Sequence, residues 1–247
     1  MILDRTGETR EMNCGLEAQI VKYINNENID VMFLKNKEII KHVKYINFKK
    51  GAIKPKFYPM VYGVGYIGNS KARDYDGKLI KSYDIWTKIL QRCYDEKSRW
   101  KYPNYSGCTV CNEWLNYTNF KKWYDDNYYE IKGQRMCVDK DILHKGNKIY
   151  SPEHCLIVPN NINVIFNVRK GNSSGFQGVS YIKNKNVYLA RSPLGDGTQK
   201  CLGYFDNKED AFESYRKAKE QFIKDMADKY VHEIPKKLYD AMYNYKI

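Results

Sequence analysis

The segment from Phe176 to Tyr230 constrains the fold more than any other part of the sequence. It contains three short runs rich in β-branched and aromatic residues, separated by the turn-forming letters KNKN and LGDGTQ. Apolar residues then recur at spacings of three and four: Ala211, Phe212, Tyr215, Ala218, Phe222, Ile223, Met226 and Tyr230. This pattern predicts three strands and one long helix that covers one face of their sheet. Asp206, with Glu209 three residues later, predicts the start of that helix.

The opposite face of this predicted sheet is left uncovered, and basic residues edge it. Lys183, Lys185, Arg191 and Lys200 fall in or beside the predicted strands. A ribbon of two or three strands fits the major groove of DNA, which is about 12 Å wide. The pattern therefore favours contact with DNA. The plainer alternative is a charged face that only keeps the sheet soluble.

Residues 174–229 resemble the AP2 DNA-binding domain. The matching residues are Gly178 and Val179, the stretch 188–191, the run LGYFD at 202–206, and Ala211, Tyr215 and Ala218 on the helix. The resemblance implies that the sheet binds double-stranded DNA. The candidate contacts are Ser180, Lys183, Lys185, Arg191, Gln199 and Lys200. Few arginines stand where plant members read bases, so we expect lysine contacts that position the DNA backbone.

A second informative stretch, Val138–Asn163, reads VDKDILHKGNKIYSPEHCLIVPNNIN. Two aspartates flank Lys140, and three of the last four residues are asparagines. Gly146 and Asn147 suit a hairpin, while the asparagines suit the start of a helix near Asn160. From spacing alone, a well-capped loop and a metal-dependent site are about equally supported.

The letters VDKDI and YSPEHCLIVPNNIN resemble the HNH (His-Me finger) nuclease family, most closely phage-borne members that also carry AP2 domains. The resemblance implies a ββα-metal module in which Asp139 and Asn163 bind one divalent ion, Mg²⁺ or Mn²⁺. His154 falls on the hairpin asparagine that orients the general base, and Asp141 is an additional carboxylate near the ion. In this chemistry the ion stabilises the leaving 3′ oxygen and the charge of the phosphorane.

Lys140 departs from the family pattern, because it stands where the family has its general-base histidine. Lysine is a poor base unless its surroundings are unusual, so we expect Lys140 to act as an electrostatic clamp on phosphate. Three outcomes stay open. His154 or His144 supplies the base, water attacks slowly without a dedicated base, or the fold persists as a DNA-binding remnant that does not cleave.

The cysteines raise the question of a structural zinc ion. Cys108 and Cys111 have zinc-knuckle spacing, but a second such pair is missing. The candidates to complete four ligands, if the fold brings them together, are Cys93, Cys137, Cys155 and His154. The alternative is buried, reduced thiols. The odd number of cysteines, seven, also indicates reduced thiols rather than a disulfide framework.

The remaining elements are predicted from local patterns. Residues 83–98 and 113–129 show helical spacing of aromatic residues, which we expect to form a core between the two helices. Short β-branched runs within 17–49 predict a small β-barrel-like module, and the letters PKKLYDAMYNY predict a tail helix around 235–245.

The sequence therefore predicts an α+β chain of three modules. They are a small β module at 1–60, an HNH-like nuclease module with preceding helices at 62–170, and an AP2-like module at 173–231 with a tail to 247.

A formal net charge of +13, spread along the 247 residues, favours a polyanionic partner, first of all nucleic acid. The chain has no apolar run of membrane-spanning length and no signal-peptide pattern at its N-terminus. We therefore expect no membrane association and a cytoplasmic location, in the bacterial host cell if the protein is phage-encoded.

These observations predict a DNA-binding, divalent-metal-dependent endonuclease or nickase of the HNH type. Two alternatives remain. One is a cleavage-dead DNA-binding protein with the same fold, and the other is a phage protein that acts on a host protein target.

Overall fold

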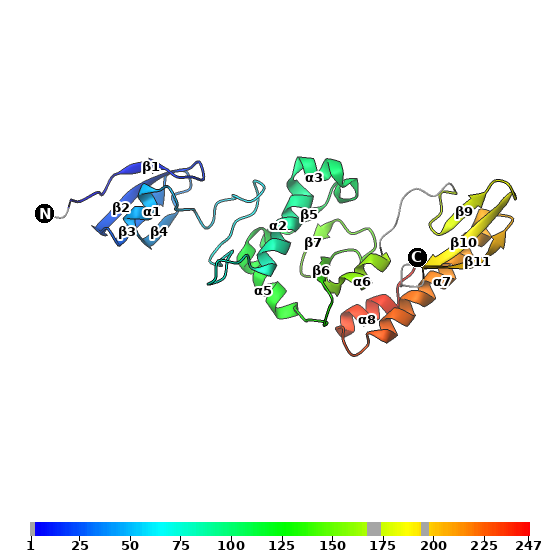
Figure 1. The fold of residues 1–247 in the computed structure, drawn as a ribbon. Helices are drawn as coiled ribbons and strands as arrows, with labels where there is room; N and C mark the ends of the chain where they lie inside the picture. The colour runs from blue at the N-terminus through cyan, green and yellow to red at the C-terminus, as the bar shows by residue number, and fades with distance from the viewer. Residues whose placement is uncertain (1–2, 167–173, 194–197) are drawn as a thin grey trace. The chain divides into compact units, whose positions relative to one another are not determined.

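The computed structural model describes residues 3–166, 174–193 and 198–247, and Figure 1 shows its fold. These residues form a mixed α+β structure with several small sheets. They divide into two compact units, residues 1–125 and 126–247. The predicted boundary at 170–173 and most of the predicted turn at 194–199 lie outside the described ranges. Within those ranges, no helix combines the length and apolar content needed to cross a bilayer.

The first unit begins with an antiparallel sheet in the order β1-β2-β3-β4. The strands are Thr9–Glu11, Glu17–Asn25, Asn28–Phe33 and Ile39–Val43. Alternate residues of β2 and β3 are buried, and they form a core with Phe48 of helix α1, Tyr45–Lys49. The sheet is open, with β1 and β4 at opposite edges, so the predicted barrel-like shape is not formed. Four short strands joined in sequence do not close on themselves, because closed barrels need more strands.

Both predicted helices of the first unit are interrupted. The first is α2, Lys81–Tyr94, followed by α3, Glu96–Lys101. Asp95 separates them because its backbone is extended, and its carboxylate accepts a hydrogen bond from the Ser98 amide at 2.8 Å as an N-cap. A 3₁₀ turn η1 (Pro103–Tyr105) and the short strand β5 (Thr109–Val110) come next. The second predicted helix is α4, Asn112–Leu115, and α5, Tyr117–Asn127.

The predicted aromatic core between these helices is present. Trp86 and Trp114 are fully buried, and the indole N–H of Trp86 donates to the Trp114 carbonyl at 2.6 Å. The Tyr117 ring lies 5.4 Å from that of Trp86, and its hydroxyl lies 2.8 Å from the Ser82 hydroxyl. These large side chains therefore join α2, α4 and α5.

The second unit begins with two antiparallel strands and a short helix. Strand β6 is Met136–Asp139, and it pairs with β8, Leu156–Pro159, so that Asp139 lies opposite Leu156. Between them lies the short strand β7, Ile149–Tyr150. Helix α6, Asn160–Asn163, follows β8 directly, as predicted, and continues into a 3₁₀ turn η2, Val164–Phe166.

The predicted three-stranded sheet and long helix complete the second unit. Strands β9 (Val179–Ile182), β10 (Val187–Pro193) and β11 (Gln199–Phe205) are antiparallel in the order β11-β10-β9, and α7 (Lys208–Lys229) contacts all three. The N-cap of α7 is Asn207, whose side chain accepts from the Asp210 amide at 2.8 Å. The predicted cap at Asp206 is therefore wrong by one residue.

Gly178 explains why the turn before β9 needs glycine. It has a φ of +73°, and an added Cβ would lie 2.0 Å from the Tyr215 ring on α7. Only a residue without a side chain allows this close approach of turn and helix.

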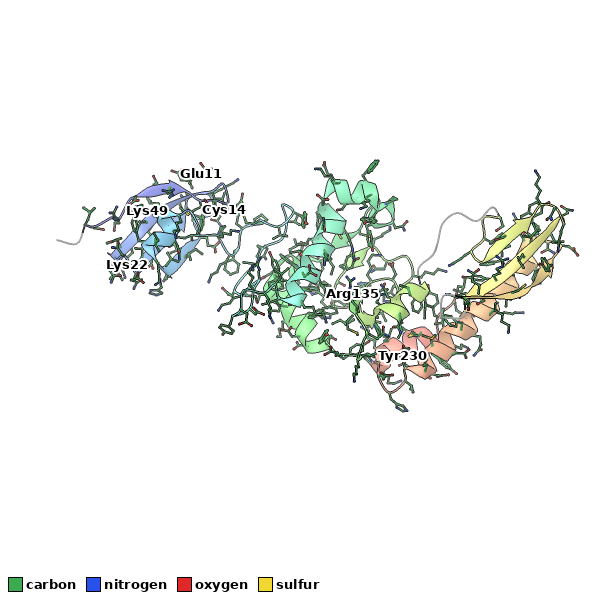
Figure 2. All side chains as sticks on the ribbon, viewed as in Figure 1. Glu11, Cys14, Lys22, Lys49, Arg135 and Tyr230 are labelled. Atoms are coloured by element: carbon green, nitrogen blue, oxygen red, sulfur yellow. The ribbon has the colours of Figure 1, made fainter. Side chains whose placement is uncertain are left out.

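Helix α7 takes part in two hydrophobic cores. Near its start, Ala211 packs against Val179 and Ala190 of the three-stranded sheet. Further along, Ile223, Ala227 and Tyr230 pack with residues of β8, α6 and the tail helix α8, Lys236–Tyr243. Tyr230 also accepts a hydrogen bond from the Asn161 amide, and Figure 2 labels it near the end of α7. Helix α7 thus packs against the β6–β8–α6 region at one end and against the three-stranded sheet at the other. Which predicted modules fold independently stays a prediction.

Candidate functional site

Asp139 ends strand β6 with one carboxylate oxygen fixed in place. Its Oδ1 accepts hydrogen bonds from the backbone amides of Asp141 and Ile142, at 2.7 and 2.8 Å. No described residue donates to its Oδ2. Burial raises the pKa of Asp139 above its ordinary value, and the charge of Asp141 adds to the rise, while the two amides and Lys140 oppose it. An anchored carboxylate whose second oxygen accepts no hydrogen bond from the described residues is suited to bind a cation.

Lys140 is almost fully buried, with 6% of its side chain exposed. Its ammonium donates to both carboxylate oxygens of Asp141, at 2.8 and 2.7 Å, and to the carbonyl of Asn147 at 2.7 Å. A lysine has three N–H donors, so all of them are used. In this arrangement Lys140 holds the β6–β7 connection closed, and it has no N–H left for an incoming phosphate.

Asn147 completes that connection, and the sequence pattern did not single out its role. Its side-chain amide donates to the carbonyls of Lys140 and Ile149, at 2.9 and 2.7 Å. Its Oδ1 accepts from the Ile149 amide at 3.1 Å. Asn147 thus fixes the loop between Asp139 and β7, and only its place beside Gly146 in a turn could have pointed to it.

The two histidines of this region lie close together. The ring centroids of His144 and His154 are 5.1 Å apart, with the rings at 64° to each other. Nδ1 of His154 lies 2.8 Å from the Ser151 hydroxyl, within the turn that precedes β8. This contact orients the ring, and Nε2 can accept a proton in the tautomer whose Nδ1–H donates to Ser151. Of the residues predicted for the site, His154 is the one whose geometry suits a base.

Asn163 has an uncommon environment for an amide. It is the last residue of α6, and its Oδ1 is buried with no hydrogen-bond partner among the described residues. Leaving a buried acceptor unsatisfied costs about 1–3 kcal/mol, so such groups call for an explanation. An amide oxygen that accepts no hydrogen bond is available to bind a cation.

Tyr245, which the sequence pattern did not indicate, feels the charge of the same carboxylates. Its ring makes an edge contact with Phe166 in η2, with ring centroids 4.7 Å apart. Burial raises the pKa of Tyr245, and the charges of Asp139 and Asp141 raise it further. The tail is held to α7, because Lys246 and the Ile247 amide both bind Glu220, each at 3.1 Å.

The donor set fits a divalent ion in type but is small. Asp139 offers a carboxylate oxygen and Asn163 an amide oxygen, and hard ions such as Mg²⁺ accept these together with water. Helix α6 contacts both β6 and β8, so the two residues belong to one packed ββα arrangement. The described residues contain no cluster of three or more His, Cys, Asp or Glu side chains arranged for a metal. An ion here would therefore depend on Asp139, Asn163 and solvent.

The cysteines proposed for zinc belong to different units. Cys93, Cys108 and Cys111 lie in the first unit, and Cys155 lies in the second, packed in the turn before β8. Cys93, Cys108 and Cys155 are buried, and no disulfide joins any of the seven cysteines. In the described ranges no set of zinc ligands surrounds them, so bound zinc stays only a prediction.

The predicted DNA contacts fall on different parts of the three-stranded sheet. Ala190 faces α7, so Arg191, the next residue, projects from the open face, where Cys201 is its cross-strand partner. Ser180 pairs with Leu189, which also pairs with Tyr204, so these three lie on the same face as Arg191. Leu189 is buried on this face, whereas Tyr204 is exposed.

The other candidates lie at the ends of the sheet. Gln199 pairs with Pro193 at one end of the strands. Lys200 pairs with Ser192, and because side chains alternate along a strand, this pair lies on the opposite face of the sheet from Arg191. Lys183 and Lys185 lie in the β9–β10 turn, where the Lys185 ammonium sits 5.2 Å from the Tyr204 ring centroid. The open face thus offers one arginine and one exposed tyrosine, with two lysines at its tip.

No protein-family model matches this chain, and no curated protein or solved structure matches it either.

Proposed function

We propose that the second unit binds double-stranded DNA and cleaves a phosphodiester bond at Asp139 and Asn163. The observation that carries this proposal is the buried Oδ1 of Asn163, which has no hydrogen-bond partner in the part of the chain that the structure describes. Asn163 lies on the helix that contacts the strand ending at Asp139. The likeness of VDKDI and YSPEHCLIVPNNIN to HNH nucleases, and of 174–229 to AP2 domains, supports the same function. The fold would then comprise a ββα-metal module and an AP2-like module.

In this proposal Asp139 and Asn163 hold a divalent ion, Mg²⁺ or Mn²⁺. When bound, such an ion supplies positive charge beside the scissile phosphate. The two amides that fix Asp139 Oδ1 hold its carboxylate in one orientation, which favours binding without further ordering. Asp141 is committed to Lys140, so it contributes to the site through the shape of the loop.

His154 is the group best suited to take a proton from the attacking water. Ser151 orients its ring through Nδ1, and an imidazole held in one orientation suits general-base catalysis. His144, 5.1 Å away between ring centroids, is the second candidate.

The proposed DNA contacts divide by role. Arg191 on the open face can reach base edges, while Lys183 and Lys185 at the β9–β10 turn suit phosphate contacts. Ser180 and Gln199 are the polar side chains that can adjust to the groove, and Lys200 lies at the margin.

A plasmid-nicking assay tests the catalytic part. We expect the wild-type chain to nick with Mg²⁺ or Mn²⁺, and Asp139→Ala to lose this activity. His154→Ala should slow nicking by about 100-fold or more, as expected for loss of a general base. Asp225→Ala, an exposed carboxylate on α7, is the matched control and should nick normally. Absence of nicking with either metal would refute the cleavage proposal.

One observation favours a second candidate, a DNA-binding protein that does not cleave. Lys140 stands at the position of the family's histidine, and its three donors are used within the protein. Duplex binding with a steep salt dependence, together with no nicking, would support this candidate. A salt slope near zero would instead favour a protein target for this basic chain.

A further inference from the structure

The segment Glu96–Tyr105, formed by α3 and η1, presents an exposed tryptophan. The Trp100 side chain is 88% exposed, whereas Trp86 and Trp114 are fully buried. Tyr102, two residues later, is also exposed, at 48%. A tryptophan in water leaves a large apolar surface uncovered, and such surfaces in folded proteins commonly bind a partner.

Cations surround this tryptophan. Lys97, Arg99 and Lys101 are exposed on the same short helix, and α3 buries none of its residues. Glu96, Lys97, Trp100 and Lys101 together line a shallow, open depression. The Lys101 ammonium lies 5.3 Å from the Tyr102 ring centroid. Basic side chains therefore alternate with exposed aromatic rings along the segment.

We propose that the Glu96–Tyr105 segment is a stacking site for an unpaired nucleobase of a DNA strand. Trp100 stacks on the base, and Lys97, Arg99 and Lys101 bind the phosphates on either side. Interleaved aromatic rings and cations are the arrangement by which proteins bind single-stranded nucleic acid. This inference deepens the proposed function and rests on it for DNA as the partner.

Two other partners fit the segment less well. A helix that binds a membrane surface needs an apolar face, and Trp100 is the single large apolar side chain of the six-residue α3. A protein interface usually surrounds its central tryptophan with residues that exclude water, whereas charged side chains surround this one.

Tryptophan fluorescence tests the site directly, because Trp100 is the most exposed of the four tryptophans. A twelve-nucleotide oligo-dT strand is titrated into the full chain at moderate salt. We expect quenching of the emission in the wild type and its loss in Trp100→Phe. In Trp100→Ala, the affinity for oligo-dT measured by anisotropy should fall about fivefold to a hundredfold, the range expected for losing one stacked base.

Tyr75→Ala is the matched control. Tyr75 is fully exposed, and the centroid of its ring lies 5.2 Å from the Lys71 ammonium. Asp74 and Asp76 flank Tyr75, so their negative charges should keep phosphates away from it. Equal oligo-dT affinity in Trp100→Ala and the wild type would overturn the stacking site. Quenching by anionic lipid vesicles but not by oligo-dT would overturn it in favour of a membrane surface.

The DNA-binding and nicking measurements together distinguish loss of the Trp100 site from loss of all DNA binding. Suppose that the wild type and Trp100→Ala bind oligo-dT equally, while the wild type nicks plasmid and binds duplex DNA through Arg191. This result would refute the stacking site alone. If the wild type neither nicks nor binds any DNA, both the proposed function and the stacking site are refuted.

Discussion

The ammonium of Lys140 lies 2.8 and 2.7 Å from the two carboxylate oxygens of Asp141, its neighbour in the chain. The lysine is almost fully buried, while the Asp141 side chain is about half exposed, at 47%. The pair therefore spans the boundary between the interior of the loop and its surface. This relationship makes Lys140 part of the scaffold of the site.

Replacing Lys140 with methionine should lower stability. The Asn147 carbonyl would lose its donor, and Asp141 would lose its partner, so we expect a loss of about 2 kcal/mol in the free energy of unfolding. Urea unfolding measures this loss, with the exposed Lys145→Met as control. A stable Lys140→Met protein that no longer nicks DNA would contradict the scaffold role and would show that the ammonium acts on phosphate.

Asn163→Ala should separate folding from ion binding. Without metal, the substitution removes a buried unsatisfied oxygen, so we expect stability to change by less than about 1 kcal/mol. With Mn²⁺ at about 100 times its dissociation constant, the wild type should gain about 2.7 kcal/mol, which the variant should lack. Thermal unfolding with and without Mn²⁺ measures both effects. Asn160→Ala, at an exposed position of α6, is the control and should keep the stabilisation by Mn²⁺. If Mn²⁺ stabilised Asn163→Ala as much as the wild type, Asn163 would not be a ligand of the ion.

Tyr245 should report the charge at Asp139. The negative charges of Asp139 and Asp141 disfavour the tyrosinate, so Asp139→Asn should lower the pKa of Tyr245, although burial keeps it above the ordinary value. NMR titration of ¹³C-labelled tyrosine measures the change. Asp225→Asn, on the exposed side of α7, should leave the pKa of Tyr245 as it is. An unchanged Tyr245 in Asp139→Asn would mean that the tail does not lie beside the site.

Lys219 gives a pH dependence of stability with a definite sign. Burial lowers the pKa of Lys219 to about 8 from 10.5, and the described residues provide no carboxylate partner. Between pH 8 and 10.5 the unfolded chain binds more protons than the folded one, so this group makes the protein more stable as pH rises. Below pH 8 the cost of burying the charge is fully present.

Lys219→Met should therefore stabilise the protein at pH 7, by about 2–3 kcal/mol. This gain should shrink as pH rises toward 10, which urea unfolding at a series of pH values can follow. Lys217→Met replaces a lysine with 71% of its side chain exposed, and it should show little change at any pH. A gain for Lys219→Met that does not vary with pH would indicate improved packing alone.

Local pattern determined much of this fold. The sequence predicted strands β9, β10 and β11 and helices α6, α7 and α8. Alternating and helical spacings of apolar residues reflect which side chains each strand or helix must bury. The breaks at Asp95 and Asn116 were missed, since a capping side chain can end a helix whose apolar spacing continues.

The contacts of the site depend on the tertiary structure more than the helices and strands do. The resemblance to HNH nucleases predicted Asp139 on a strand and Asn163 on the following helix, and both elements are present. Only the tertiary structure decided that the Lys140 ammonium donates to the Asn147 carbonyl, and that the Asn163 amide oxygen is buried with no partner among the described residues. It also decided that the charges of Asp139 and Asp141 raise the pKa of Tyr245. These interactions involve residues that are not adjacent in the sequence, and their geometry depends on how the strands, loops and helices pack together.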